Sequence, residues 1–222
     1  MTVPRSDGFE RTKVRRLPEK QVTERSALYA ILDAARVAHV AVADADADAD
    51  GQTYVLPVAF ARDGDDLLIH GSTGSRLFRA LTSGAPTCVT VTLLDGMVLA
   101  RSAFESSMHY RSAMMFGRCA VVPADDVGRC LEVLTEHLMP GRWAQLRPPT
   151  AKELAATTLL RMPLREWSVK ISDGWPDDPL EDLHEPVWAG VVPIQSAFGT
   201  PLPTPDLQEP YEPPPYLARW TP

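Results

Sequence analysis

The residues of this chain best suited to chemistry lie in one short loop, His70 to Arg76, with the sequence HGSTGSR. Its two glycines let the backbone approach an anion, its three hydroxyl groups can donate hydrogen bonds, and the guanidinium of Arg76 can hold two phosphate oxygens. A helix is predicted to begin after the loop, and its first amide groups would favour negative charge. The loop therefore has the parts of a phosphate site. A Ser/Gly turn that only caps the helix explains the same residues equally well.

Other catalytic and nucleotide-binding signatures do not fit. The loop is neither GxxxxGK[ST] nor GxGxxG, and no GxSxG elbow occurs, so P-loop, Rossmann and serine-hydrolase sites are excluded. Asp46, Asp48 and Asp50 precede Gly51 as in the first half of a calcium loop, but the twelfth position is Pro57 instead of glutamate. A solvated hairpin loop is the better explanation of these aspartates.

Histidines and cysteines do not predict a metal site. His39 stands in an apolar run, where a buried histidine with a satisfied ring is commoner than a ligand. His109, His137 and His184 have no partner at HxxH or HxxxH spacing. The three cysteines are Cys88, Cys119 and Cys130. Without CxxC spacing they predict no thiolate metal site and no disulfide framework, and we expect small buried hydrophobes.

Hydrophobic periodicity predicts the elements that precede the loop. A helix is expected over residues 23–36, with Thr23 as its cap. Residues 37–43 and 53–61 are β-branched runs that predict a hairpin. Pro57 cannot donate to a ladder, so it indicates an edge, a bulge or a ligand contact in the second strand.

Strands and helices alternate through the middle of the chain. Strands are predicted at 67–70, directly before the loop, and at 86–94, where apolar and polar residues alternate. A turn at residues 95–96 is expected to reverse the chain. Another strand is predicted at 114–122, followed by a helix from about Asp125 with a single apolar stripe.

The last regular elements lead into a proline-rich segment. Thr150 and Glu153 form a capping box for a short helix, and extended runs follow at 158–164 and 165–171. The whole predicts a mainly antiparallel β (α+β) domain, barrel-like, with six or seven strands and inserted helices. From Pro176 onward the chain carries 12 of its 21 prolines. This segment is expected to form neither helix nor inner strand, and to wrap over the domain or a partner subunit.

Composition limits the class of protein. Apolar residues make up 45% of the chain and charged residues 23%, which is typical of a soluble globular protein. A net charge of -7 argues against a nucleic-acid partner. The basic cluster Arg11, Lys13, Arg15 and Arg16 is short, and a solvated arm explains it. No signal peptide and no membrane span are evident, so we expect a cytoplasmic protein.

Ordered segments across most of the chain resemble a known family. They are KVRRLPE, VAHVAV, YVLPVAF, DDLLIHGSTGSR, CVTVTLLDGMVLARS, MHYRSAMMFG and HLMPGRW. In this order they resemble the flavin-nucleotide-binding branch of the pyridoxamine-5′-phosphate-oxidase-like superfamily, which includes the nitroimidazole-resistance type of reductase. The resemblance implies an FMN-binding split β-barrel that forms a homodimer with two FMN sites at the subunit interface. Together with the change of composition after about Ile171, it divides the chain into an N-terminal arm (1–22), the barrel domain (23–172) and a Pro-rich extension (173–222).

The resemblance also implies which residues hold the cofactor. Residues 70–76 would hold the FMN phosphate, residues 57–59 would run along the flavin ring, and residues 110–112 and 115–116 would close the site, in part from the other subunit. His70 matches a histidine near the flavin in the nitroimidazole-resistance relatives. The implied cofactor-binding residues are Pro57, Val58, Ala59, His70, Gly71, Ser72, Thr73, Ser75, Arg76, Tyr110, Arg111, Ser112, Met115 and Phe116.

One difference from the family argues against the activity that gives the family its name. Pyridoxamine phosphate oxidases carry an Arg-x-His near the C-terminus that engages the substrate, and this sequence has none. We expect instead an FMN-dependent oxidoreductase that passes electrons from NAD(P)H to a small acceptor, such as a nitroaromatic or a quinone, with His70 or Tyr110 delivering a proton. Two alternatives stay open: a flavin-binding storage or sensor protein without turnover, and a split barrel that holds F420 or haem, the haem with His70 as ligand.

Overall fold

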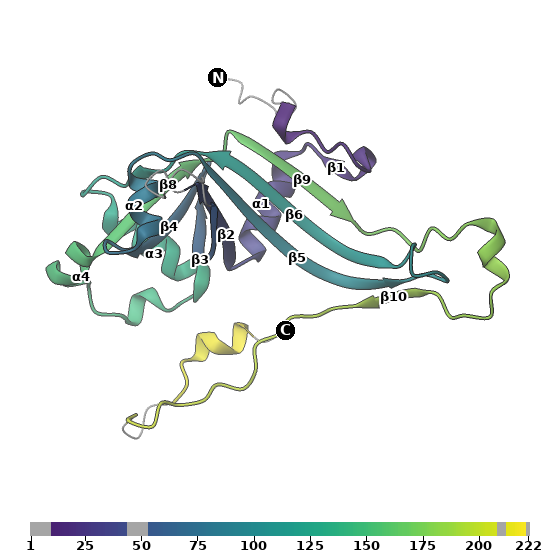
Figure 1. The fold of residues 1–222 in the computed structure, drawn as a ribbon. Helices are drawn as coiled ribbons and strands as arrows, with labels where there is room; N and C mark the ends of the chain where they lie inside the picture. Colours follow the sequence, from purple (N-terminus) through teal and green to yellow (C-terminus); the bar gives the residue numbers. More distant parts are fainter. Residues whose placement is uncertain (1–9, 44–52, 208–211, 221–222) are drawn as a thin grey trace.

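The computed structural model describes residues 10–43, 53–207 and 212–220, and its centre is one antiparallel sheet wrapped around a core (Figure 1). The strand order is β1-β9-β6-β5-β2-β3-β4-β8-β7, and β10 pairs with β5 off this path. The two ends of the sheet do not meet. The predicted fold class, a split barrel with inserted helices, is therefore confirmed, with ten strands in the described residues instead of six or seven.

The strands and helices have the following bounds. The strands are β1 (Gln21–Val22), β2 (Val37–Ala43), β3 (Thr53–Asp63), β4 (Asp66–Ser72), β5 (Thr87–Leu99), β6 (Ser107–Gly117), β7 (Ala120–Val121), β8 (Thr157–Pro163), β9 (Glu166–Ser172) and β10 (Gly190–Pro193). The α-helices are α1 (Arg25–Ala34), α2 (Arg76–Thr82), α3 (Val127–Leu138) and α4 (Ala151–Ala156). The aspartates considered for calcium, Asp46, Asp48 and Asp50, lie outside the described residues.

The helices form where the hydrophobic pattern predicts them, although one start differs. Glu24, not Thr23, is the N-cap of α1, and its side chain makes no capping bond. The apolar spacing predicts which face of a helix is buried, but it predicts the first residue of the helix only to within one or two positions. The capping box of α4 is present: Thr150 Oγ1 accepts from the Glu153 amide at 3.3 Å, and Glu153 Oε2 accepts from the Thr150 amide at 2.8 Å.

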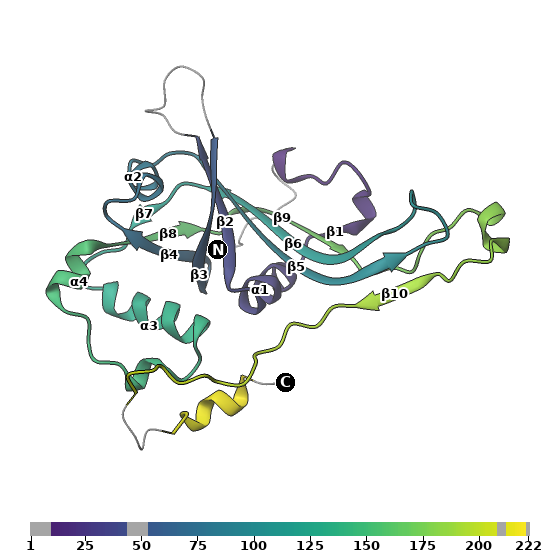
Figure 2. The same cartoon turned by 60° about the horizontal axis from the view of Figure 1, so that its bottom comes forward.

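The predicted turn at residues 95–96 is wrong. Strand β5 passes this point through a bulge between Leu94 and Gly96 and continues to Leu99. Gly96 serves a close approach instead, since a Cβ there would lie 3.0 Å from the Val192 carbonyl oxygen of β10. Strands β5 and β6 thus form a long ribbon that leaves the barrel, and β10 pairs along its outer part (Figures 1 and 2). We call this outer part, residues 94–110 with β10, the arm.

The strand predicted at 114–122 is also corrected. Its first part ends β6 at Gly117, and its last part is the separate two-residue strand β7, which pairs with β8 instead of β5. Close packing marks the change of partner, because a Cβ at Gly117 would lie 2.8 Å from the Met162 side chain. The chain therefore crosses from one half of the split sheet to the other at this glycine.

Two apolar clusters fill the molecule. The main core lies between the inner faces of the barrel strands, α1 and α2, and includes Leu28, Phe60 and Trp167. A second cluster under α3 includes Leu68 of β4 and Cys130. Cys119 and Cys130 are buried as predicted, whereas Cys88 is only half-buried. The strand β4 thus has one face on the main core and the other on the α3 layer.

Ion pairs fix α3 against the sheet. The Arg129 guanidinium holds both carboxylate oxygens of Asp63 in β3, at 3.0 and 2.7 Å, and also pairs with Asp126 at 2.7 Å. Arg161 of β8 reaches Asp126 at 2.6 Å. The hydrogen bonds from Arg129 lower the pKa of Asp63, so this carboxylate stays charged well below neutral pH. The layer that covers the outer face of β4 is therefore held by charges from three elements.

The C-terminal segment returns from the arm to the end of α3 (Figure 2). Trp220 Nε1 donates to the Pro140 carbonyl at 3.0 Å, and the Tyr216 hydroxyl bonds Gln145 at 3.2 Å. Gly141, with φ of 87°, leaves room for Tyr216, since a Cβ there would lie 3.0 Å from the Tyr216 side chain. No helix within the described ranges has the length and apolar character needed to cross a membrane.

Candidate functional site

The predicted strand, loop and helix around residues 70–76 are present. Strand β4 ends at Ser72, and α2 begins at Arg76. Gly71 is the constrained position, because a Cβ there would lie 2.2 Å from the ring of Phe78, which is buried. The second glycine, Gly74, has no comparable constraint, since the nearest atom to its Cβ would be Ser72 Oγ at 3.6 Å. Gly71 therefore seats α2 against the sheet.

The loop differs from the expected cradle in its amide groups. The Thr73 amide donates to the Ala156 carbonyl at 3.1 Å, the Gly74 amide to Ser72 Oγ at 3.2 Å, and the Ser75 amide to the Ser72 carbonyl at 3.0 Å. These three amides are engaged within the protein. A phosphate at this loop would therefore be held by hydroxyl groups and by Arg76, and not by the loop amides as the sequence suggests.

A small pocket opens beside the start of α2. Ser75 and Arg76 line it together with Tyr54 and Leu56 of β3, and its volume is about 160 Å³. The Arg76 guanidinium lies over the Tyr54 ring at 4.2 Å, which orients it toward the hairpin. Pockets for complete cofactors span roughly 300–1,000 Å³. This small pocket thus fits the phosphate end of a ligand but not a whole flavin.

The outer face of the sheet gathers several of the predicted flavin residues. Ala38 and Val40 of β2 are buried in the core, so His39 between them points to the opposite face. Its neighbours across the strands are Pro57 of β3 and Thr90 of β5, and Thr90 in turn lies opposite Met114 of β6. By the same alternation, the outer face also carries Ala59, Tyr110, Ser112 and Phe116. His39 is exposed, so the expectation of a buried histidine is wrong.

Three of the predicted residues point the other way. Met115 is fully buried in the main core, and Val58 packs against that core. Arg111 holds Asp95 through two hydrogen bonds of 2.9 and 2.7 Å, and these lower the pKa of Asp95. A ligand on the outer face could reach Met115 and Val58 only through their backbone.

His70 lies apart from the outer-face residues. It pairs with Leu159 of β8 and shares the face of β4 that packs toward α3. Its Nδ1 atom is buried and has no hydrogen-bond partner among the described residues. Burial lowers the pKa of His70, so the ring is neutral at physiological pH. Tyr110 pairs with Leu94 and Ser172 in the other part of the sheet, so the two residues suggested as proton donors are not brought together.

A second, larger pocket was missed by sequence reasoning. It has a volume of about 670 Å³ and is lined by Arg11, Arg118 and Arg165 over Cys88 and Phe116. Arg11 belongs to the basic cluster that was explained as a solvated arm, but its side chain holds Glu166 of β9. Arg118 and Arg165 are 47 positions apart in the sequence. No local pattern could have joined them.

Comparisons with known proteins give related families and structures. The sequence model of the family described as pyridoxamine 5′-phosphate oxidase matches residues 24–171. The solved FAD and heme binding protein from Mycobacterium smegmatis is 46% identical, with a TM-score of 0.85 over 91% of this chain and 97% of that one. The flavocytochrome Anf3 from Azotobacter vinelandii is 36% identical, with a TM-score of 0.86 over 96% of this chain and 97% of that one.

A more distant structure supports the fold alone. A protein from Bacteroides thetaiotaomicron, described under 5-nitroimidazole antibiotic resistance, is 18% identical, with a TM-score of 0.57 over 68% of this chain and 86% of that one. No curated protein matches the sequence.

Proposed function

Because the chain belongs to the pyridoxamine 5′-phosphate oxidase family, we propose that it binds a flavin and passes electrons from NAD(P)H to a small acceptor such as a nitroaromatic or a quinone. The observation that carries the proposal is similarity along almost the whole chain to two solved structures. One is described as an FAD and heme binding protein, and the other as a flavocytochrome. The flavin would supply the redox chemistry, and the chain would supply binding, orientation and exclusion of water.

The residues present fit the phosphate end of a flavin. Ser75 offers a hydroxyl group, and Arg76, oriented by Tyr54, offers a guanidinium beside the small pocket. Thr73 lines a separate pocket with Arg79 and Thr158, so it is not part of this phosphate site. Pro57 would lie under the ring on the outer face, where the absence of an amide hydrogen on Pro57 leaves an apolar surface. Ser112, three strands away on the same face, would lie beyond the edge of that ring. FMN is the flavin that the sequence resemblance implies. FAD is the one named for the Mycobacterium smegmatis protein.

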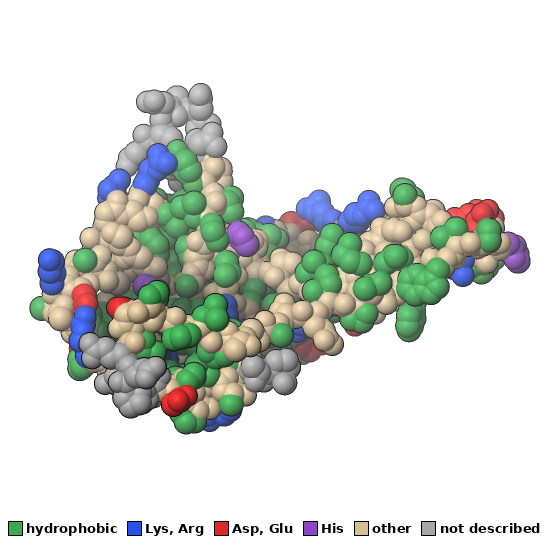
Figure 3. Space-filling model, turned by 90° about the horizontal axis from the view of Figure 1, so that it is seen from below, with side chains coloured by type: hydrophobic (Ala, Val, Ile, Leu, Met, Phe, Trp, Pro, Cys, Tyr) green, Lys and Arg blue, Asp and Glu red, His purple; other side chains and the backbone are tan. Residues whose placement is uncertain are grey.

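We expect the site to be completed by a second copy of this chain. The outer face carries exposed apolar side chains, with Val37 50% and Val55 57% exposed, and others follow along the arm, as Figure 3 shows. A pocket of 160 Å³ leaves most of a flavin uncovered in one chain. Light scattering should therefore give twice the mass of one chain. A monomer that nonetheless retains flavin would contradict this arrangement.

Anaerobic titration with NADH and with NADPH tests the proposed activity. Hydride transfer to the flavin would bleach its absorbance near 450 nm, at about one equivalent of donor per flavin. Subsequent addition of a nitroaromatic or a quinone should restore the absorbance. Bound flavin that neither donor bleaches would reject the enzyme and favour the storage or sensor alternative.

Haem is a second candidate, favoured by the two relatives of 46% and 36% identity. His70 is the residue that would hold the haem iron, since its ring is neutral at physiological pH and its buried Nδ1 has no partner in the described part of the chain. Bound haem would add a one-electron carrier to the flavin. A Soret band in the protein as isolated, or after addition of haemin, is the first observation required.

A further inference from the structure

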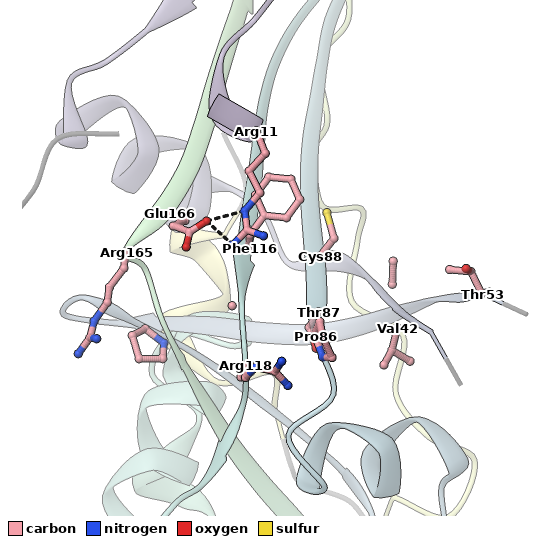
Figure 4. Close-up of a pocket in the computed structure, with 13 residues that line it drawn as sticks. Arg11, Val42, Thr53, Pro86, Thr87, Cys88, Phe116, Arg118, Arg165 and Glu166 are labelled. Atoms are coloured by element: carbon pink, nitrogen blue, oxygen red, sulfur yellow. Dashed lines mark hydrogen bonds and ion pairs between the residues drawn. The ribbon is translucent and has the colours of Figure 1, made fainter. Parts of the chain in front are cut away.

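The pocket of about 670 Å³ lies on the outer face of the sheet, and no residue of the loop 70–76 lines it (Figure 4). We call it the arginine pocket. The register places Ala41, Cys88, Phe116 and Glu166 in one row across β2, β5, β6 and β9, and this row forms its floor. Small side chains beside the ring of Phe116 make a surface on which a planar group can lie. The volume falls in the range of sites for nucleotide-sized ligands.

The pocket is positively charged in an acidic chain. Three arginines and one carboxylate line it, while the whole chain carries a net charge of -7. Arg11 neutralises that carboxylate, because its Nε atom donates to Glu166 at 2.6 Å, and its guanidinium lies 5.1 Å from the centre of the Phe116 ring. Arg118 is held toward the Gly84 carbonyl by a hydrogen bond. Arg118 and Arg165 thus leave an excess of positive charge, which favours phosphate.

The arginine pocket adjoins the small pocket at the start of α2. Val42, near the end of β2, lines both, and Thr53 of the first pocket is followed by Tyr54 of the second. A molecule with a phosphate at Arg76 could therefore continue into the arginine pocket. A separate ligand could also bind there next to the flavin.

We propose that the arginine pocket binds an adenine nucleotide, with its phosphates on Arg118 and Arg165 and its base over the floor beside Phe116. Two sources supply this group: the adenylate half of FAD, whose flavin end lies at the loop, and a free nicotinamide dinucleotide that donates electrons. The inference rests on the proposed function only in placing the arginine pocket beside a flavin site. ADP contains the whole adenine nucleotide that the pocket is proposed to bind, so its binding can be tested without a flavin.

The double variant Arg118→Ala/Arg165→Ala tests the inference in the holoprotein. Both side chains are exposed, so folding should persist. Loss of two charge-assisted contacts should weaken adenine-nucleotide binding by at least about tenfold. The matched control is Arg147→Ala/Arg219→Ala, which removes the same charge from exposed positions that do not line the pocket. Flavin released by denaturation identifies FAD or FMN, and calorimetry with ADP and with NADPH measures free nucleotides.

The possible results distinguish binding of FAD, binding of a free nicotinamide dinucleotide, and no adenine-nucleotide binding in the arginine pocket. Affinity for FAD that falls while affinity for FMN holds would assign the adenylate half of FAD. Bound FMN with weakened affinity for ADP and NADPH would assign a separate donor. The inference is overturned if the variant binds FAD, ADP and NADPH like the wild type, or if the control loses as much. Absence of any flavin rejects the proposed function, whereas ADP binding that depends on Arg118 and Arg165 would leave this inference standing.

Discussion

Replacing Gly71 with alanine is expected to lower the free energy of unfolding by about 1–3 kcal/mol and to weaken flavin binding at the same time. The new Cβ would lie 2.2 Å from the ring of Phe78, a distance that real Cβ atoms do not show, so the ring or the strand must move. Phe78 is 4% exposed and lies in α2, whose first residue is Arg76. Displacement of this ring therefore moves the guanidinium proposed to hold the phosphate. Thermal unfolding and flavin titration measure the two effects.

A second substitution distinguishes a steric cause from loss of the glycine itself. In the double variant Gly71→Ala/Phe78→Leu, the smaller side chain should recover part of both losses relative to Gly71→Ala, which a double-mutant cycle expresses as coupling. Gly128→Ala in α3 is the control, since a Cβ there meets nothing within 4 Å and alanine favours a helix. Equal effects of alanine at positions 71 and 128 would show that Phe78 does not constrain the loop.

Local patterns predicted most of the elements, because each depends on residues close in sequence. The β-branched runs at residues 37–43 and 53–61 and the capping box at Thr150 correspond to a hairpin and to α4 in the structure. The turn at residues 95–96 failed for a physical reason. A glycine after an aspartate signals a turn, but Gly96 is needed where β10, almost a hundred residues later, pairs closely with β5. The sequence near Gly96 contains nothing that distinguishes the two uses.

The candidate site was only partly predictable, since its parts come from different halves of the sheet. The loop 70–76 is contiguous, and its outline could be found from residue types alone. The direction of each side chain depends on register, and register placed Met115 in the core and His39 on the outer face. The arginine pocket needs the N-terminal arm, the end of β6 and the start of β9 together. These segments are distant in sequence and come together only in the folded chain, so no local sequence pattern predicts the pocket.

Substitution of His70 is expected to abolish haem binding while flavin binding persists. His70 lies on the face of β4 toward α3, whereas the small pocket and the outer face lie on other surfaces of the sheet, so the two cofactors would depend on different residues. We expect His70→Ala and the larger His70→Gln to lose the Soret band completely, since neither side chain replaces the neutral imidazole that would hold the iron. The absorbance of the Soret band relative to that of the flavin, after loading with haemin, measures the effect.

The exposed histidine of the outer face provides the matched comparison. His39→Ala removes the same side chain from a position beside Pro57 and Thr90 and should leave the Soret band intact. Its effect should appear instead in the flavin spectrum, because His39 lies on the face proposed for the ring. A Soret band that survives in both His70 variants but disappears in His39→Ala would move the haem to the outer face. That result would place both cofactors on one surface and remove His70 from the site.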